Sequence, residues 1–348
     1  MDRLRGEILR VSIERLTSTH DFNELDAFAA SLAKSSVFQT GKMAHIYSQA
    51  SGTRPLALVA REASGEIIAS LAGVAFSHFL DYPSILAPFT EHFAIRGSPL
   101  SETSTEGTET VRTLLQELQK EFGSRGLYLR CYPDWLAPSL TGFEACGYLR
   151  EDWLNIAVDL EGSEEQILGN MSKHRRKGIG VGEREGLGIM EVSTTAQLDS
   201  LYALLANAHR ILRIPFQKRP LFEAVLREMV SERAGLMLLA TRGNELLAGR
   251  VILLYRGVAY DWYAGSTHHG KELHADEWLT WKAMLLAKQR GALEFDFGGA
   301  GKPSEDYGPR EFKRRFGGVL TNVGRYTKVI GRVRFAMTDF TQAVLRRV

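Results

Sequence analysis

The stretch that decides the fold of this chain is Leu293-Glu294-Phe295-Asp296-Phe297-Gly298-Gly299-Ala300-Gly301, which precedes Phe312-Lys313-Arg314-Arg315-Phe316-Gly317-Gly318. The first segment predicts a buried strand that runs into a glycine-rich turn. The second segment places a dense cationic cluster between phenylalanines. Fixed positive charge beside permissive backbone suits an anionic or phosphorylated ligand.

Outward from this stretch, helix and strand patterns alternate along the whole chain. In the second half we predict a helix that opens at 163–166 and further strands and helices at 153–160, 198–212, 220–232, 235–241, 245–255, 258–264, 276–290 and 293–297. The first half predicts the elements 21–34, 55–61, 66–76, 83–89, 111–122 and 127–130. The two halves follow a similar order with negligible sequence identity, so they repeat a pattern only.

This order predicts an α/β protein with mixed sheets flanked by helices. The duplicated pattern is similar to two tandem N-acetyltransferase-like (GNAT-like) domains packed together. We expect an N-terminal domain at 1–151 and a C-terminal domain at 152–348. The length of 348 residues is comfortable for two domains of ordinary size.

Composition bounds the class of protein and of partner. The chain is 44% hydrophobic and 24% charged, as expected for a globular protein, and its net charge is only +2. The charge is uneven, because residues 302–348 contain eleven Lys or Arg and four Asp or Glu. Such a basic end favours a phosphate, a nucleic acid or a membrane surface, and a solvated basic surface is the simpler alternative.

The cysteines and the N-terminus suggest a compartment. Cys131 and Cys146 form no CxxC or metal-binding spacing, so we expect reduced, buried thiols. The N-terminus resembles no signal peptide, and no stretch is long and apolar enough to span a bilayer. We therefore expect a cytoplasmic protein without stable membrane insertion, which would reach any lipid-linked substrate at the inner membrane surface.

The strongest basic run is Asn170-Met171-Ser172-Lys173-His174-Arg175-Arg176-Lys177. We predict a helix whose Lys173 and Arg176 contact a phosphate or an RNA backbone; an exposed helix face is the alternative. Part of the run, Arg175 to Gly180, also matches R-x-x-G-x-G, the pyrophosphate loop of acetyl-CoA-dependent acetyltransferases. Because the predicted context is a helix and not a strand-to-helix turn, we interpret this match as chance.

A second basic segment, residues 208–220, joins two predicted helices. Arg210, Arg213 and Arg219 are crowded around Pro215, which ends the first helix. Arginine is well suited to bidentate phosphate binding, so these three are candidate substrate-binding residues. An ordinary surface loop is the alternative.

Other kinds of site find little support. His268, His269, His274, Asp276 and Glu277 fit no helical metal-binding spacing, so we expect no metal and prefer the two acids as favourable residues of a helix first turn. The chain has no G-x-S-x-G nucleophile elbow, and neither cysteine has a recognisable nucleophile context.

Three stretches together resemble the FemABX family. The first is the strand, helix and basic run from Ile156 to Lys177. The second is Tyr263-Ala264-Gly265-Ser266 with the following helix that bears Trp278 and Trp281. The third and most specific is the opening stretch, which resembles the family elements "DfgG" and "FK..FGg" in the right order.

The resemblance implies a duplicated GNAT-like fold that uses aminoacyl-tRNA as donor and needs no cofactor. The acceptor would be an amine of a nucleotide- or lipid-linked muropeptide or of another peptide. Lys313 matches the family lysine thought to stabilise the oxyanion that forms at the ester carbonyl, which agrees with the chemistry of aminolysis. Asp296 is a candidate proton acceptor, with a structural role at the strand end as the alternative.

The resemblance also implies contacts to substrate. Tyr263, Gly298, Gly299 and Arg314 fall in its motifs, and the two glycines would permit close approach of backbone to ligand. Two other functions remain open at this point. One is an acyl-CoA-dependent N-acyltransferase that acts on a polysaccharide or small-molecule amine. The other is a non-catalytic RNA- or phosphate-binding module.

Overall fold

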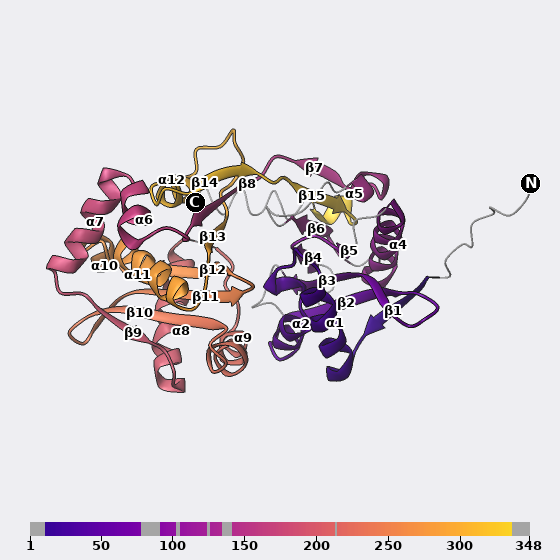
Figure 1. Cartoon of the computed structure of the whole chain (residues 1–348), viewed down its shortest axis with the longest axis horizontal. Helices are drawn as coiled ribbons and strands as arrows, with labels where there is room; N and C mark the ends of the chain where they lie inside the picture. The colour runs from indigo at the N-terminus through magenta and orange to yellow at the C-terminus, as the bar shows by residue number, and fades with distance from the viewer. Residues whose placement is uncertain are drawn as a thin grey trace, which may run out of the picture. The chain divides into compact units, whose positions relative to one another are not determined.

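The structure is a computed structural model that describes residues 11–77, 91–101, 105–123, 126–133, 141–212 and 214–335. The chain divides into two compact units between Glu151 and Asp152, and again between Gly324 and Arg325. Each unit contains a mixed sheet with helices against it, which confirms the α/β class and the duplicated GNAT-like architecture (Figure 1). The predicted strand 83–89 lies outside the described residues.

The first unit is built on a sheet with the strand order β1-β2-β3-β4-β6-β15-β7, and β5 pairs with β3. Its strands are β1 Ser12–Leu16, β2 Thr53–Arg61, β3 Ile67–Ser77, β4 Glu91–Arg96, β5 Leu100–Ser101, β6 Tyr128–Tyr132, β7 Leu149–Glu151 and β15 Arg325–Val329. Its helices are α1 Thr19–Ser31, η1 Val37–Gln39, α2 Gly41–Ser48, α4 Thr105–Phe122 and α5 Thr141–Ala145. Helix α4 is amphipathic, and it buries Leu114, Leu115 and Leu118 completely in the core beside the sheet.

The second unit differs from the C-terminal domain that we expect at 152–348, because Arg325 and the residues of β15 belong to the first unit. This strand comes from the C-terminal part of the chain, but it pairs antiparallel with β6 and β7 of the first sheet (Figure 1). Arg325, for example, pairs with Glu151 both in the ladder and by an ion pair of 2.7 Å. A long-range strand pairing of this kind has no local signature, so the sequence pattern alone did not place it.

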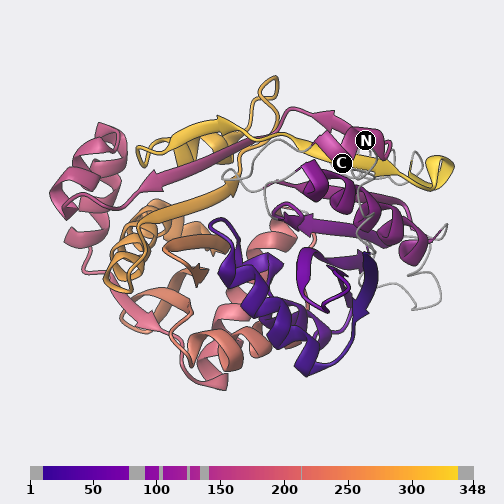
Figure 2. The same cartoon turned by 45° about the vertical axis from the view of Figure 1, so that its right-hand side comes forward.

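The second unit has the strand order β14-β8-β13-β12-β11-β10-β9. Its strands are β8 Leu154–Asp159, β9 Gly188–Glu191, β10 Gly235–Arg242, β11 Glu245–Tyr255, β12 Val258–Ser266, β13 Glu294–Gly299 and β14 Val319–Asn322. Its helices are α6 Glu164–Asn170, α7 Lys173–Arg184, α8 Thr195–Ile211, α9 Arg219–Val225, a π-helical turn Leu226–Val230, α10 His268–Glu272, α11 Ala275–Gln289 and α12 Gly308–Arg314. In Figure 2 the magenta β8 runs beside the yellow β14, its antiparallel partner.

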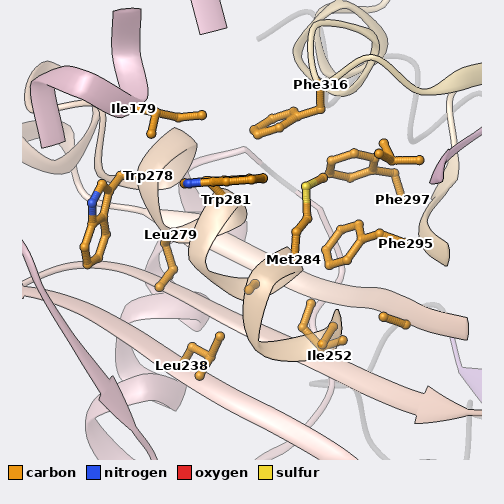
Figure 3. Packing of buried hydrophobic residues seen from close by; sticks show 14 of the residues in the cluster. Ile179, Leu238, Ile252, Trp278, Leu279, Trp281, Met284, Phe295, Phe297 and Phe316 are labelled. Carbon is orange, nitrogen blue, oxygen red and sulfur yellow. The ribbon is translucent and has the colours of Figure 1, made fainter. Parts of the chain in front are cut away.

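The two faces of the second sheet are covered by different helices. Helix α11 packs on the face that carries Leu238 and Ile252, and its Met284 lies beside Phe295 and Phe297 of β13 (Figure 3). Helix α8 packs against β11 and β12, where a Cβ added at Gly249 would come within 2.5 Å of the Leu201 side chain. Burial of each large apolar side chain contributes about 1.5–3 kcal/mol, so the α11 core fixes β13 firmly.

Local signals account for several helix boundaries. Ser163 and Gln166 form a capping box at the start of α6. The basic run, however, is not one helix: α6 ends at Asn170, Met171 is extended, and Ser172 accepts a hydrogen bond from Arg175 N to begin α7. This capping serine, in the middle of the run, sets which basic side chains face inward.

Candidate active site

The candidate site lies where β12 and β13 stop pairing. These parallel strands pair only at Val258 with Glu294, Ala259 with Phe295 and Tyr260 with Asp296, although β12 continues to Ser266 and β13 to Gly299. On its other side β12 has a bulge, because Asp261 pairs with Ile252 and Tyr263 with Val251, which leaves Trp262 as an extra residue. A bulge bends and twists its strand. Residues 261–266 of β12 and 297–299 of β13 do not pair with each other, and we call these two strand ends the strand split.

Lys313 reaches the strand split from α12. Its Nζ donates to Phe297 O and to Gly299 O, both at 2.7 Å. These two carbonyls flank Gly298, whose φ of +68° lies in the left-handed region that favours glycine. An ammonium group has three N–H donors, so one of them is left for another acceptor once these two bonds are made.

Burial and two nearby carboxylates act in opposite directions on the pKa of Lys313. Burial lowers the pKa of Lys313 below its ordinary value of 10.5. Asp261 and then Asp296 oppose this change by favouring the charged form, whereas Arg250 adds to it. The side chain is therefore a desolvated cation whose electrostatic influence on a nearby ligand is stronger than that of a surface lysine.

Two hydrogen bonds hold the Asp296 carboxylate in place in this arrangement. Its Oδ1 accepts hydrogen bonds from Asn155 Nδ2 at 2.8 Å and from Gly298 N at 2.7 Å. Burial raises the pKa of Asp296, and the hydrogen bonds from Gly298 and Asn155 oppose the rise. These contacts tie β13 to β8 and fix the glycine turn that Lys313 clamps from its own side.

The two predicted ligand-approach glycines serve different purposes. A Cβ added at Gly298 would meet nothing within 4 Å, and only the positive φ demands glycine there. A Cβ added at Gly299 would lie 2.7 Å from Trp153 Nε1, so this glycine permits close approach of a side chain of the protein itself. Backbone approach by a ligand remains a prediction for both glycines.

A buried ion network that the sequence reasoning missed lies beside the strand split. Arg250 on β11 is 1% exposed and pairs with Asp261 Oδ2 at 2.5 Å and with Asp276 Oδ1 at 2.6 Å. Burial raises the pKa of Asp261, and Arg250 opposes that rise. The signal was available, because Arg250 and Asp261 are charged residues inside otherwise apolar strands, where an unpaired charge is costly.

The basic run presents one buried arginine and several exposed cations. Arg175 is 2% exposed, donates to Phe312 O at 2.8 Å, and has its guanidinium 4.2 Å from the ring centroids of both Phe312 and Phe316. It also pairs with Glu277 at 3.1 Å. Arg175 therefore anchors the Phe-Lys-Arg-Arg-Phe segment, and with it Lys313.

The two residues that we predicted from that run have other positions. Lys173 is exposed in the first turn of α7. Arg176 is exposed but donates to Gly169 O at 2.9 Å and Met171 O at 2.5 Å, so it caps the end of α6. Contact of either residue with phosphate remains a prediction.

The R-x-x-G-x-G match does not form a strand-to-helix loop. Gly178 and Gly180 lie inside α7, and Gly182 follows one turn after Gly178. A Cβ added at Gly178 would lie 3.0 Å from His274 Nδ1, and one at Gly182 would lie 2.7 Å from Trp278. These two glycines let α7 pack closely on the α11 region, which confirms our interpretation of the match as chance.

The second basic segment gathers less free positive charge than its sequence suggests. Arg219 pairs with Asp199 at 2.6 Å and with Glu223 at 2.8 Å, and Arg210 is exposed and donates to Asn207 at 2.9 Å. Arg213 lies outside the described residues. A phosphate contact by this segment is supported by Arg210 more than by Arg219, whose charge is already matched.

Tyr263 belongs to an aromatic cluster on the α8 face of β12. Its ring centroid lies 5.0 Å from that of Phe222, 5.4 Å from Phe216 and 5.9 Å from His209. Burial lowers the pKa of His209, whose Nδ1 contacts Leu205 O at 2.9 Å. Phe222 is fully buried and Tyr263 is half-buried, so Tyr263 is both a packing residue and a candidate surface for a ligand.

Arg314 and the histidine-rich turn complete the set of predicted residues. Arg314 is 59% exposed and pairs with Glu311 at 2.9 Å, and Arg314 and Arg315 lower the pKa of Glu311 to about 2. Asp276 and Glu277 lie in the first turn of α11, as predicted, where they pair with Arg250 and Arg175. Among the described residues, no group of His, Cys, Asp and Glu could hold a metal ion.

Comparisons with known proteins agree with this architecture. Residues 169–314 match the model of the family described as Acetyltransferase (GNAT) domain. The crystal structure of FemX is similar at a TM-score of 0.67 with 14% identity, over 93% of this chain and 99% of that one. A search of curated proteins finds no match.

Two further solved structures share the fold. The C-terminal domain of a protein described as a lysylphosphatidylglycerol synthetase from Agrobacterium fabrum has a TM-score of 0.57 and 13% identity, over 92% of this chain and 96% of that one. A tandem GNAT protein from the clavulanic acid biosynthesis pathway has a TM-score of 0.55 and 11% identity, over 92% and 99%. No helix in the described ranges is long and apolar enough to cross a membrane. Residues 169–314 are therefore similar to a GNAT-type acetyltransferase domain, and the solved structures share the tandem fold of this chain.

Proposed function

We propose that this protein is an aminoacyltransferase that moves an amino acid from aminoacyl-tRNA to an amine, and that Lys313 stabilises the oxyanion of the reaction. The observation that carries the proposal is the Lys313 ammonium held at the strand split by Phe297 O and Gly299 O, with one N–H left to donate. A preorganised cation of this kind lowers the barrier where negative charge develops.

The reaction needs little more from the protein than position and charge. The acceptor amine attacks the ester carbonyl, whose oxygen gains negative charge beside Lys313. Collapse of the tetrahedral intermediate forms the amide bond, breaks the ester C–O bond and releases the ribose hydroxyl, which takes the proton that the amine loses, directly or through water. No covalent enzyme intermediate is required, in agreement with a site built on a cation.

The starts of the two helices that follow β12, α10 and then α11, argue against a CoA donor. At the start of α10, which comes directly after the strand, the Thr267 side chain already accepts a hydrogen bond from Gly270 N. A GNAT pyrophosphate loop binds phosphate with free backbone N–H groups at such a strand-to-helix transition. Here the first turn of α11 carries Asp276 and Glu277, and His274 precedes it in the left-handed conformation without a side-chain cap. These two carboxylates already pair with Arg250 and Arg175 at the start of α11, so acidic groups occupy the place where a pyrophosphate would bind, and a donor without one fits better.

Exposed cations beside the motif favour an RNA donor. Lys173 and Lys177 on α7 are exposed, as is Arg314 on α12. Arg315 O accepts a hydrogen bond from Ser172 N, which brings the beginning of α7 to the end of α12. The resulting basic surface suits the phosphates of an acceptor stem, whose binding would weaken with added salt.

For the acceptor we propose an amine of a peptidoglycan precursor or a related peptide. This choice rests on the FemABX-like motifs around Lys313 and on the fold shared with FemX. The lysylphosphatidylglycerol synthetase fold raises a lipid hydroxyl as a second acceptor class, which would be met at the inner membrane surface. We propose a cytoplasmic location in either case.

A donor panel tests the proposal. Purified protein is incubated with tRNA charged with radiolabelled amino acids, or with labelled acetyl-CoA, and with UDP-linked muropeptide, lipid-linked muropeptide or phosphatidylglycerol vesicles. We expect amide product with charged tRNA and a muropeptide only. Product with acetyl-CoA alone would establish the acyl-CoA alternative, and tRNA binding without turnover on any acceptor would establish a binding module.

A further inference from the structure

The strand split places a carboxylate and an ammonium one step beyond the last paired residues. Tyr260 and Asp296 form the last pair of β12 and β13. The next residue on β12 is Asp261, and the next on β13 is Phe297, whose carbonyl accepts the Lys313 ammonium. Asp261 and Phe297 therefore each follow the last pair of the ladder directly, so the residue that bears the carboxylate and the carbonyl that holds the ammonium both begin the strand split.

Asp261 is anchored on one side and unmatched on the other. Its Oδ2 accepts from Arg250 Nη1 at 2.5 Å, and its side chain is only 7% exposed. Its Oδ1 is buried and has no hydrogen-bond partner within the described part of the chain. A buried carboxylate oxygen without a donor is costly, so its retention calls for an electrostatic partner.

Among the charged groups beside the strand split, Lys313 is the electrostatic partner of Asp261. Arg250 alone serves two acids, Asp261 and Asp276, so the anchored network carries one excess negative charge. The groups that act on Lys313 are Asp261 from β12, Asp296 from β13 and Arg250 from β11. Asp296 already accepts two hydrogen bonds, which leaves Asp261 as the less satisfied carboxylate.

We propose that Asp261 is a positioning residue, anchored by Arg250, that keeps the Lys313 side chain in its charged ammonium form at the strand split. Lys313 can donate to an oxyanion and hold its two carbonyl contacts only as the ammonium, because a neutral amine has two N–H donors. The electrostatic part of this proposal concerns Lys313 itself, and its catalytic consequence rests on the proposed function.

The first test follows the titration of Lys313 without any substrate. The 13Cε resonance of Lys313 is assigned in lysine-labelled protein by its absence from K313R, and it is titrated in the wild type, in Asp261→Asn and in Asp276→Asn. We expect the Lys313 titration to move down by about one pH unit or more in D261N. The matched control D276N removes a charge from the same arginine, and we expect it to move the titration by less than half as much.

The outcomes are separable from the fate of the aminoacyl-transfer proposal. An unchanged titration in D261N, or an equal change in D276N, would overturn the role of Asp261. A second variant guards against misfolding of D261N: Asp261→Glu keeps the charge, and we expect Lys313 to titrate near its wild-type pH in D261E. A downward change in D261E as large as that in D261N would also overturn it.

A second readout links the proposal to transfer. The alkaline limb of the pH–rate profile should move to lower pH by the same amount in D261N and return in D261E, which restores the charge. In K313R, whose guanidinium stays charged, any residual rate should show no alkaline limb, with or without D261N. A rate that falls in D261N equally at all pH values would indicate a purely structural residue and contradict the proposal.

Discussion

Each unit of this chain has a parallel strand pair inside its sheet, and the two pairs differ in what they hold. In the first unit β4 and β6 pair from Phe93 with Leu129 through Arg96 with Tyr132. In the second unit β12 and β13 pair at three positions and then part. The two units therefore share a kind of fold, but the parallel strands stay paired to the end of β4 in the first unit and separate before the ends of β12 and β13 in the second.

The side chains explain the difference. At the β4–β6 junction Phe93, Ile95, Leu129 and Cys131 are all 0% exposed and form part of an apolar core. Burial raises the pKa of Cys131, so this thiol stays protonated and acts as a packing group. Apolar contacts of this kind reward close pairing of the two strands.

At the β12–β13 junction the corresponding level carries charge. Asp261, Asp296, Arg250 and Lys313 meet there, and the Trp262 bulge and the Gly298 turn alter the course of both strands. The candidate site therefore depends on the side chains and backbone irregularities at the β12–β13 junction, and not on the strand order of the fold.

The largest effect should come from breaking the buried network. Arg250→Ala would leave Asp261 and Asp276 buried without a counter-charge, so we expect a loss of about 3–5 kcal/mol in the unfolding free energy of the second unit. Urea denaturation followed by tryptophan fluorescence measures it, because Trp278 and Trp281 are buried in that unit.

Arg130 on β6 is the matched residue in the first unit. It is half-buried, stacks 4.4 Å from the Tyr128 ring centroid and donates to Thr327 at 3.0 Å. We expect Arg130→Ala to cost about 1–2 kcal/mol, measured by circular dichroism. Equal losses in the two variants would break the comparison between a charged and an apolar junction.

The glycines of α7 offer an intermediate effect that separates packing from ligand binding. Gly182→Ala would place a Cβ 2.7 Å from Trp278, so we expect a loss of about 1–3 kcal/mol in stability. Gly180→Ala meets only Arg184 Nη1 at 3.5 Å, and it should raise stability by about 0.5–1 kcal/mol without changing transfer. A G180A variant that folds but fails to use its donor would restore the pyrophosphate-loop interpretation.

The smallest effect should follow Asp296→Asn, because an amide oxygen can still accept from Asn155 and Gly298 N. We expect stability at neutral pH within about 1 kcal/mol of the wild type and transfer within about tenfold. The raised folded-state pKa means that the native protein binds a proton more tightly than the unfolded chain, so this group's contribution falls as pH rises from 3.8 through the folded value.

The acid titration of stability therefore distinguishes the roles of Asp296. D296N should abolish that part of the slope, as measured by urea denaturation at a series of acidic pH values. A loss of transfer far beyond tenfold, with stability preserved, would instead assign Asp296 the catalytic proton acceptance that the sequence also allowed.

Sequence reasoning placed the strand and the glycine turn correctly because these are local features, and the catalytic role of Lys313 stays a prediction. The apolar run 293–297 became β13, and the charged first turn of α11 formed as predicted. It could not choose Arg175 over its basic neighbours, because the choice depends on Phe312 and Phe316, far away in the chain. Helix periodicity fixes faces, not the partner of each face.

Two other features were missed for related reasons. Arg250 and Asp261 are charged residues within apolar strands, which signals a buried ion pair, but no local signal shows that the β12–β13 ladder ends beside Asp261. Strand β15 joins the first sheet through pairings that no turn motif announces. Candidate residues were thus predictable where they lie within a short sequence motif. They were missed where their role depends on contacts with residues that are distant in the sequence.

The central claim is that the Lys313 ammonium at the strand split stabilises the transition state of aminoacyl transfer. The direct test is single-turnover transfer from aminoacyl-tRNA by K313A, with Lys328→Ala as the control from the first unit. Lys328 likewise donates to a carbonyl, Cys146 O at 2.6 Å, but it lies on β15. Melting curves confirm that both variants fold.

We expect K313A to transfer about 10²–10³ times more slowly than the wild type, with unchanged affinity for the donor, and K328A to transfer at the wild-type rate. A folded K313A that transfers as fast as the wild type would contradict the account.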